Sequence, residues 1–295
     1  MRRFRPGKKA ILFGSVILLL LGGTVFSWVI GSLLVAPHQT TVSLPPAFVG
    51  TEVKFPSTSG AQLRGNLLHG QPGKGMVILM HGVRGNRGAM ADHAVFLHRA
   101  GFSVLLFDFQ AHGESPGSKI TSGYLESMDA AAAVLFAREK FSTERIGVLG
   151  SSLGGAAVVL AEPPLNIDAA VLELVYSDIN TAIKNRIAII LGEWARPFSC
   201  MLVWQLKPRL GISPAALNPA ERIAHLSCPK LILAGGKDRH TTLADTQLLF
   251  SRATPPKELW VIEDAAHQNL HEIAGIEYEN KIIAFFEQHL STSKH

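Results

Sequence analysis

Short apolar runs alternate with segments of helical spacing along most of the chain. Residues 124–140 and 154–162, like 89–100, are spaced as helices, and 51–57 with 62–70 indicates an opening antiparallel pair. Alternating strands and helices predict a mostly parallel sheet with helices on both faces. The buried strands of this sheet are expected at residues 75–82, 102–109, 145–150, 169–176, 229–236 and 257–265.

One interval breaks this alternation. Between the strand ending near Tyr176 and the strand starting near Lys230 lie about fifty residues that are rich in Trp, Leu and Ile. This is too long for a simple crossover, so the interval, taken as 178–225, predicts helices over the carboxyl edge of the sheet. They either pack on the core as surface helices or form a cap that lines an apolar substrate pocket.

The first apolar segment differs from the other runs in its length. No charged residue occurs between Ala10 and Ala36. As a helix this segment would be roughly 40 Å long, whereas the apolar core of a bilayer is about 30 Å thick. Residues 10–36 therefore predict one transmembrane helix. A cleaved signal peptide is the alternative, but its apolar region is usually shorter, and Pro37 stands where a small-residue cleavage site would be needed.

Positive charge is concentrated at the N-terminus. The rest of the chain has 23 basic against 23 acidic residues, which removes the main support for a nucleic-acid partner. By the positive-inside rule, residues 1–9 form a cytoplasmic tail, and the domain lies outside the cytoplasm, in the periplasm if the source is bacterial. Residues 37–47 predict a linker and 48–295 one domain. The basic residues of the tail are Arg2, Arg3, Arg5, Lys8 and Lys9.

The stretch GVLGSSLGG, residues 147–155, follows a predicted strand. A Walker A loop needs a lysine after its glycines, and a dinucleotide fingerprint needs G-x-G-x-x-G; neither spacing occurs here. Residues 150–154 do match G-x-S-x-G between a strand and a helix. The pattern predicts a sharp turn that exposes the hydroxyl of Ser152 and leaves Ser151 as a bystander.

A nucleophilic serine needs a base, an acid that orients the base, and donors for the oxyanion. His267 follows the last predicted strand and Asp238 the strand before it, so both are expected at the carboxyl edge beside Ser152. The order serine, aspartate, histidine is the one that this strand topology demands. The predicted oxyanion donors are the backbone amides of Leu153, at a helix N-terminus, and Val83, after an earlier strand.

Three other acids lie near the same edge. Asp245 is expected inside the following helix and Asp178 at the start of the long interval, while Asp264 is too close to His267 in sequence to orient it easily. Asp238 therefore remains the predicted partner of the histidine.

The remaining polar residues near the strand ends have other predicted roles. His81 is expected to be structural, and Asp108 and His112 to shape a loop, because no catalytic role is vacant for them. His271 stands four residues after His267, a spacing that suits a metal-binding pair. Without an H-E-x-x-H pattern or a third ligand, no metal site is predicted.

Several motifs occur together and in order: MHGVRGN, DFQAHGES, GSSLGG, GGKDRHT and DAAHQNL. With them, residues from about 48 to 290 resemble the α/β-hydrolase fold, and specifically its serine-hydrolase branch near the membrane-anchored Bem46-like and S33 serine-aminopeptidase-like groups. The resemblance implies an eight-stranded, mostly parallel sheet with a helical cap, and Ser152, His267 and Asp238 as nucleophile, base and acid. The loop DFQAHG, residues 108–113, lacks the Arg and Gly common at this place in the family.

These observations predict a single-pass, membrane-anchored serine hydrolase that cleaves an ester, thioester or amide through an acyl-enzyme. No metal or organic cofactor is required. The substrate is expected to be a small or lipid-like acyl compound, with carboxylic esters favoured by the apolar interval and the membrane helix. A serine peptidase, and a non-catalytic binding protein on the same fold, are the alternatives. Cys200 and Cys228 allow one disulfide without requiring it.

Overall fold

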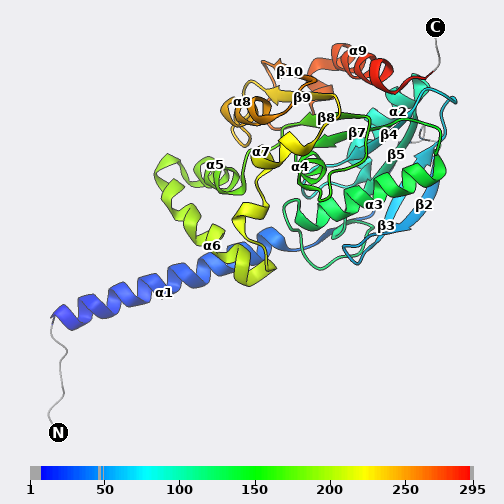
Figure 1. Ribbon diagram of the computed structural model, residues 1–295. Coiled ribbons are helices and arrows are strands. Elements are labelled where there is room, and N and C mark those ends of the chain that lie inside the picture. Colours follow the sequence, from blue (N-terminus) through cyan, green and yellow to red (C-terminus); the bar gives the residue numbers. More distant parts are fainter. Residues whose placement is uncertain (1–7, 46–47, 49, 293–295) are drawn as a thin grey trace.

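The computed structural model describes residues 8–45, 48 and 50–292. Its centre is an eight-stranded sheet with the order β10-β9-β8-β7-β4-β5-β3-β2 (Figure 1). β3 runs antiparallel to both β2 and β5, and the other neighbours are parallel. The predicted mostly parallel sheet is therefore confirmed. The strands are β2 (Thr51–Pro56), β3 (Gln62–Leu68), β4 (Met76–Met80), β5 (Ser103–Asp108), β7 (Ile146–Ser151), β8 (Ala169–Glu173), β9 (Lys230–Gly235) and β10 (Lys257–Ile262).

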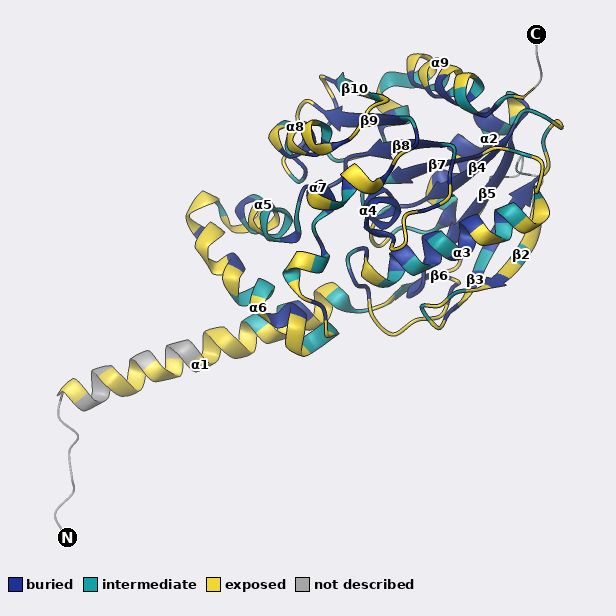
Figure 2. Cartoon of the chain, in the orientation of Figure 1, coloured by how far each residue is buried: buried dark blue, intermediate teal, exposed yellow. Residues whose placement is uncertain are grey.

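Helices cover both faces of the sheet because the central strands are apolar on both sides. In β4, alternate side chains enter opposite cores: Met76 and Ile78 join one cluster, and Val77 and Leu79 join the other. The first cluster packs against α3 (Tyr124–Lys140), α4 (Leu153–Leu160) and α8 (Leu243–Arg252). The second packs against α2 (Ala91–Arg99) and α9 (Leu270–Leu290). The buried strands form the dark centre of Figure 2.

The interval between β8 and β9 is helical. It contains α5 (Ile179–Leu191), α6 (Ser199–Leu210) and α7 (Pro219–Arg222), with short 3-10 turns at Glu193–Phe198, Pro214–Ala216 and Ile223–His225. Asp178 starts α5 by accepting hydrogen bonds from the amides of Asn180 and Thr181. In Figure 1, α5 and α6 lie to one side of the sheet and its covering helices. We call α5, α6 and the turn between them the cap.

The N-terminal helix α1 (Lys8–Val35) leaves the domain as a long rod, and its last turns contact α6 (Figure 1). Gln205 donates to Ser27 Oγ at 2.8 Å, and the Arg209 guanidinium lies 4.3 Å from the centre of the Trp28 ring. After α1, the chain forms β1 (His38–Gln39), which pairs with β6 (His112–Gly113). The cap and α1 are thus joined.

Two sequence predictions concern this N-terminal region. Among the residues that the structure describes, no helix is both long enough and apolar enough to cross a membrane. The described residues do not include 1–7 of the predicted tail or 46–47 of the predicted linker.

The two cysteines, Cys200 and Cys228, are both free thiols.

Candidate active site

Ser152 stands on a sharp turn between β7 and α4. Its backbone has φ +50° and ψ −104°, a strained conformation for a residue with a side chain. The neighbouring glycines are required by close approach: a Cβ on Gly150 would lie 2.6 Å from the carbonyl carbon of Gly154, and one on Gly154 would lie 2.3 Å from the carbonyl oxygen of Met80. The glycines are therefore spaced as they are because backbone atoms around Ser152 leave no room for a Cβ at these two positions.

Ser152, His267 and Asp238 form a chain of hydrogen bonds. The Ser152 hydroxyl lies 3.2 Å from His267 Nε2, and His267 Nδ1 lies 2.8 Å from Asp238 Oδ2. An ionised Asp238 accepts only, so Nδ1 carries the proton and Nε2 is left to accept from the serine. The three residues come from the ends of β7, β9 and β10, which meet at one edge of the sheet. This geometry suits nucleophilic catalysis.

Asp238 is held as a carboxylate by its neighbours. Its side chain is fully buried, and it accepts hydrogen bonds from the His240 amide (2.7 Å), the Thr241 amide (3.0 Å) and the Thr241 hydroxyl (2.6 Å). Burial alone would raise the pKa of Asp238, but the hydrogen bonds from His267 and Thr241 outweigh it and keep the pKa below its ordinary value. A permanent negative charge beside His267 favours the protonated histidine that forms during proton transfer.

The three rival acids are engaged elsewhere. Asp245 accepts from Ser177 Oγ at 2.8 Å and lies inside α8, as the sequence predicts. Asp178 caps α5. Asp264 forms an exposed ion pair with Lys237 at 2.7 Å. None of the three is hydrogen-bonded to the catalytic histidine candidate among the described contacts, so Asp238 alone occupies that position.

His271 pairs with a carboxylate rather than with the candidate site. Its Nε2 lies 2.9 Å from Glu279 Oε1. Within residues 8–45, 48 and 50–292, no group of three or more His, Cys, Asp or Glu side chains is arranged to hold a metal ion.

The segment after β4 runs beside the serine. A Cβ on Gly82 would lie 3.7 Å from Ser152 Cβ, and Val83 next to it lines the same cavity as Ser152. Leu153 is the first residue of α4. Of the two predicted oxyanion donors, the amide of Val83 thus belongs to the segment that runs beside Ser152, and the amide of Leu153 to the N-terminus of α4, where the helix dipole is positive.

His81 holds that segment through hydrogen bonds. It is completely buried, which lowers its pKa to about 3 and keeps the ring neutral. His81 Nε2 accepts from the Phe109 amide at 3.2 Å, so Nδ1 carries the proton and donates to the Gly82 carbonyl at 2.8 Å. These contacts tie the segment after β4 to the segment after β5, which is the structural role expected for His81.

The loop DFQAHGES is fixed by an arginine that the sequence reading did not single out. Arg87 forms an ion pair with the buried Asp108 and a second one with Glu114 at 2.7 Å, and its amide donates to Asp108 Oδ1 at 2.6 Å. His112 Nδ1 contacts the Gln110 carbonyl at 2.9 Å. Asp108 and His112 therefore shape this loop, as predicted.

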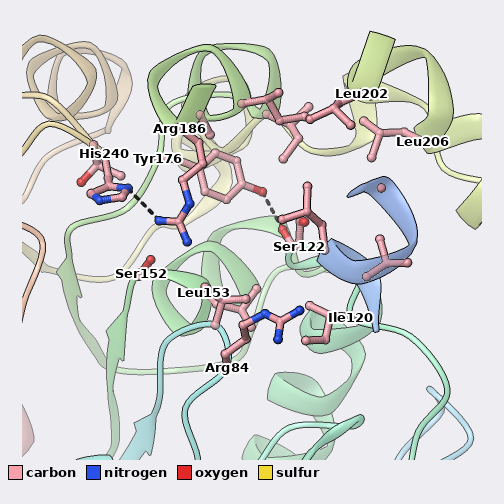
Figure 3. Close-up of a pocket in the computed structure, with 18 of the residues that line it drawn as sticks. Arg84, Ile120, Ser122, Ser152, Leu153, Tyr176, Arg186, Leu202, Leu206 and His240 are labelled. Atoms are coloured by element: carbon pink, nitrogen blue, oxygen red, sulfur yellow. Dashed lines mark hydrogen bonds between the residues drawn. The ribbon is translucent and has the colours of Figure 1, made fainter. Parts of the chain in front are cut away.

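A cavity of about 240 Å³ adjoins Ser152 and His267 (Figure 3). Its described lining is largely apolar and contains no Asp or Glu, but it contains three arginines. The sheet edge, the cap and the end of α1 all contribute, so one wall comes from the segment predicted to span a membrane. Neither the arginines nor this wall was singled out from the sequence, because both arise from contacts between distant segments. The lining used below comprises Leu34, Val35, Arg84, Ile183, Arg186, Leu202, Leu206 and Arg209.

The chain is similar in sequence to one protein family and to several known proteins. Residues 71–199 match the family described as serine aminopeptidase, S33. The uncharacterized protein Rv2307c of Mycobacterium tuberculosis is 29% identical over 244 residues, covering 81% of this chain and 79% of that protein. A lysophosphatidylserine lipase of Danio rerio, ABHD12, is 26% identical over 196 residues, or 62% of this chain and 48% of the relative.

Solved structures share the fold. An esterase of Pyrococcus furiosus, Pf2001, superimposes with a TM-score of 0.72 at 24% identity, covering 88% of this chain and 99% of the esterase. An esterase of Exiguobacterium antarcticum superimposes with a TM-score of 0.61 at 12% identity, covering 80% of this chain and 100% of that one. These likenesses show that the fold of this chain is one that other proteins share.

Proposed function

We propose that the chain is a hydrolase with the α/β-hydrolase fold and that it cleaves a carboxylic ester through an acyl-enzyme formed on Ser152. The observation that carries this proposal is the hydrogen-bond chain from Ser152 through His267 to Asp238, which adjoins an apolar cavity. The proposed reaction needs no metal or organic cofactor, since every proton transfer has a side chain to perform it.

In the proposed reaction Ser152 Oγ attacks the ester carbonyl while His267 Nε2 takes the hydroxyl proton. The amides of Val83 and Leu153 stabilise the oxyanion, and Asp238 stabilises the protonated His267. His267 then gives its proton to the departing alcohol. A water molecule then gives a proton to His267 and attacks the acyl carbonyl. The bond to Ser152 breaks, the acid leaves, and His267 returns the proton to Ser152 Oγ.

The charges that line the cavity favour an ester over a peptide with a free amino terminus. An aminopeptidase holds the ammonium group of its substrate, which requires a carboxylate or comparable acceptors near the nucleophile. The described lining has no Asp or Glu, and its arginines would repel an ammonium group. The apolar walls suit an acyl chain. The name of the Danio rerio relative, a lysophosphatidylserine lipase, also favours a lipid ester.

The proposal includes the location of the enzyme: α1 anchors it in a membrane, with the N-terminus in the cytoplasm and the hydrolase domain outside. Three observations support it. Residues 10–36 carry no charge. The side chains of Phe13, Leu18 and Leu21 are 60–74% exposed on a helix that stands away from the domain (Figure 2). Trp194 and Trp204 of the cap, both exposed, are residues that favour the membrane interface.

A fluorophosphonate probe tests the catalytic part of the proposal. It should label the wild type and Ser151→Ala but not Ser152→Ala, because the described contacts join His267 Nε2 to the hydroxyl of Ser152 and not to that of Ser151. Absence of labelling in folded wild-type protein would favour the non-catalytic alternative. Faster cleavage of aminoacyl-nitroanilides than of p-nitrophenyl esters would favour the peptidase.

Reporter fusions test the location. A C-terminal alkaline phosphatase, which is active only outside the bacterial cytoplasm, should be active, and the fusion should stay in the membrane fraction after a carbonate wash. Activity of a cytoplasmic reporter at the same position, or release by carbonate, would contradict the proposed anchor and orientation.

A further inference from the structure

We propose that the substrate carries a negatively charged group close to its ester, and that Arg84 and Arg186 bind this group. The class of substrate is therefore an anionic monoacyl amphiphile, whose chain lies against the apolar walls and whose phosphate or carboxylate lies between the two guanidinium groups. This inference deepens the ester-hydrolase proposal and rests on it.

The two arginines approach the cavity from opposite sides. Arg84 follows the oxyanion candidate Val83 directly and has φ +58°, an uncommon conformation for a residue with a side chain. Arg186 comes from α5 in the cap. In Figure 3 the Arg186 side chain enters from the helical side and Arg84 from the opposite side, with Ser152 beside the space between them. A charged group next to the scissile ester would thus meet both.

Neither arginine is neutralised by an acid. Among the described contacts, Arg84 donates to the Leu33 carbonyl of α1, and Arg186 Nη1 lies 2.9 Å from His240 Nδ1. Neither takes part in an ion pair with a described residue. Burial and the proximity of His267 lower the pKa of His240, so its ring accepts as a neutral group and leaves the charge of Arg186 unbalanced.

The third arginine of the cavity has a different surrounding. Arg209 donates to Ser32 Oγ, to the Trp28 carbonyl and to Gln205 Oε1, at 2.7, 2.7 and 2.8 Å, and it stacks on the Trp28 ring. Its donors thus join α6 to α1. The contrast supports a ligand role for Arg84 and Arg186, whose five N–H donors each are only partly used and whose fork geometry suits carboxylate and phosphate oxygens.

The walls around the arginines indicate what accompanies the negative charge. Leu34 and Val35 of α1, Ile183 of α5, and Leu202 and Leu206 of α6 all face the cavity. These side chains bind an alkyl chain through the hydrophobic effect and give no hydrogen bonds to it. A chain on one side and an anion on the other is the pattern of a single-chain amphiphile.

Two matched pairs of esters test this inference. The carboxylate pair is 4-nitro-3-(octanoyloxy)benzoate against neutral p-nitrophenyl octanoate. The phosphate pair is 1-octanoylglycerol 3-phosphate against neutral 1-octanoylglycerol. For each pair the measured quantity is the ratio of kcat/KM, anionic over neutral, in each variant relative to the wild type. This double ratio cancels differences in leaving-group reactivity and in the amount of active enzyme.

Arg186→Gln and Arg84→Gln should each lower the double ratio by about tenfold or more for at least one pair, and the two changes together should lower it further. Arg186→Lys should retain part of the preference, because it keeps the charge and loses the fork. Lys184→Gln is the matched control: it removes one positive charge from an exposed site on the same helix outside the cavity lining, and its ratio should stay within about twofold of the wild type.

The outcomes separate the two proposals. If the double ratio falls only for the phosphate pair, the bound group is a phosphate. If it falls only for the carboxylate pair, the bound group is a carboxylate. Either result supports the inference. If folded wild-type enzyme hydrolyses the neutral esters and both glutamine variants leave both ratios within about twofold, the anion site is wrong and the hydrolase proposal stands. If folded wild type cleaves none of the four esters and takes no fluorophosphonate label, the hydrolase proposal fails, and the inference with it.

Discussion

The cavity has two sides that are built in different ways. The sheet side presents Ser152, His267 and Asp238 from the ends of buried strands, and backbone groups approach so closely there that Gly154 has no room for a Cβ. The helical side consists of α1 and the cap, where Trp194 is 72% exposed and a Cβ on Gly22 would meet nothing within 4 Å.

This difference matches two different tasks: the sheet side holds the catalytic residues in place, and the helical side contacts the substrate and the surroundings. Catalytic distances must hold to fractions of an ångström, which dense packing and buried hydrogen bonds provide. Choice of substrate and attachment to a surface depend on side chains that face open space, and those change without disturbing the core. We therefore expect substitutions on the sheet side to reduce turnover or stability strongly, and substitutions on the helical side to change selectivity.

Asp238→Asn is expected to have the largest effect. An asparagine keeps the shape of the side chain but presents no charge to His267, and it favours the wrong tautomer of the ring. The value of kcat for p-nitrophenyl butyrate should fall by about a thousandfold or more. Asp264→Asn is the control, since Asp264 sits on the same edge in an exposed ion pair. Similar rates for the two variants would refute the role of Asp238.

The same change, glycine to alanine, can be made on the sheet side at Gly154 and on the helical side at Gly22. In Gly154→Ala the added Cβ would lie 2.3 Å from the Met80 carbonyl oxygen, so the turn must shift. Such crowding costs on the order of 1–3 kcal/mol of unfolding free energy, and displacement of Ser152 should lower kcat as well. Gly22→Ala in α1 adds the same atom in open space on a helix, so kcat should stay unchanged and the unfolding free energy should not fall. Urea unfolding and esterase assays measure the two effects, and equal behaviour of the variants would remove the contrast.

The sheet side is also the side that sequence reasoning described well. Burial on both faces makes the central strands continuous apolar runs, so the strands and the residues at their ends could be predicted from the pattern. The turn has no room for larger residues at Gly150 and Gly154, which is why their spacing in the sequence identifies Ser152. Asp238 and His267 followed because strand order brings their loops to one edge.

The helical side was described less completely, for a physical reason. Nothing in the local pattern of Arg84 or Arg186 distinguishes a ligand-facing guanidinium from a solvated one, since that depends on which distant segments pack nearby. The same holds for α1: its apolar run predicted a helix, but its contact with α6 through Trp28 and Arg209 requires tertiary structure. The periodicity of apolar and polar residues therefore does not identify side chains whose role is to line a cavity.

Glu173→Gln tests how tightly the sheet side is packed beneath the nucleophile. Glu173 ends β8, its carbonyl accepts from the Ser152 amide at 2.7 Å, and its carboxyl is a partner of the Tyr278 hydroxyl. Burial raises the pKa of Glu173 from 4.5 to about 7. The folded state therefore prefers the protonated acid, and the stability this group contributes is fully present below pH 4.5 and is lost as the pH rises to about 7.

Glutamine imitates the protonated acid at every pH. The unfolding free energy of Glu173→Gln relative to the wild type should thus improve between pH 4.5 and pH 8, by no more than about 3 kcal/mol. Urea unfolding at the two pH values measures this difference. Glu277→Gln removes an exposed carboxylate nearby and should show no such trend. A flat difference for Glu173→Gln would mean that the carboxyl is solvated in the folded protein.

Leu206→Ala addresses the helical side and should have the smallest effect on catalysis itself. Leu206 lies in α6, only 8% exposed, and lines the cavity opposite the sheet edge. Its removal lengthens the space for an acyl chain while the hydrogen bonds of Ser152 remain, so the preference among p-nitrophenyl esters of four to twelve carbons should move toward longer chains. One or two methylenes correspond to about a tenfold change in relative kcat/KM. Leu191→Ala, at an exposed site of α5 outside the cavity lining, should keep the wild-type profile. If Leu206→Ala instead lowers kcat equally for all chain lengths, the cap takes part in holding the catalytic residues, and the division between the two sides of the cavity fails.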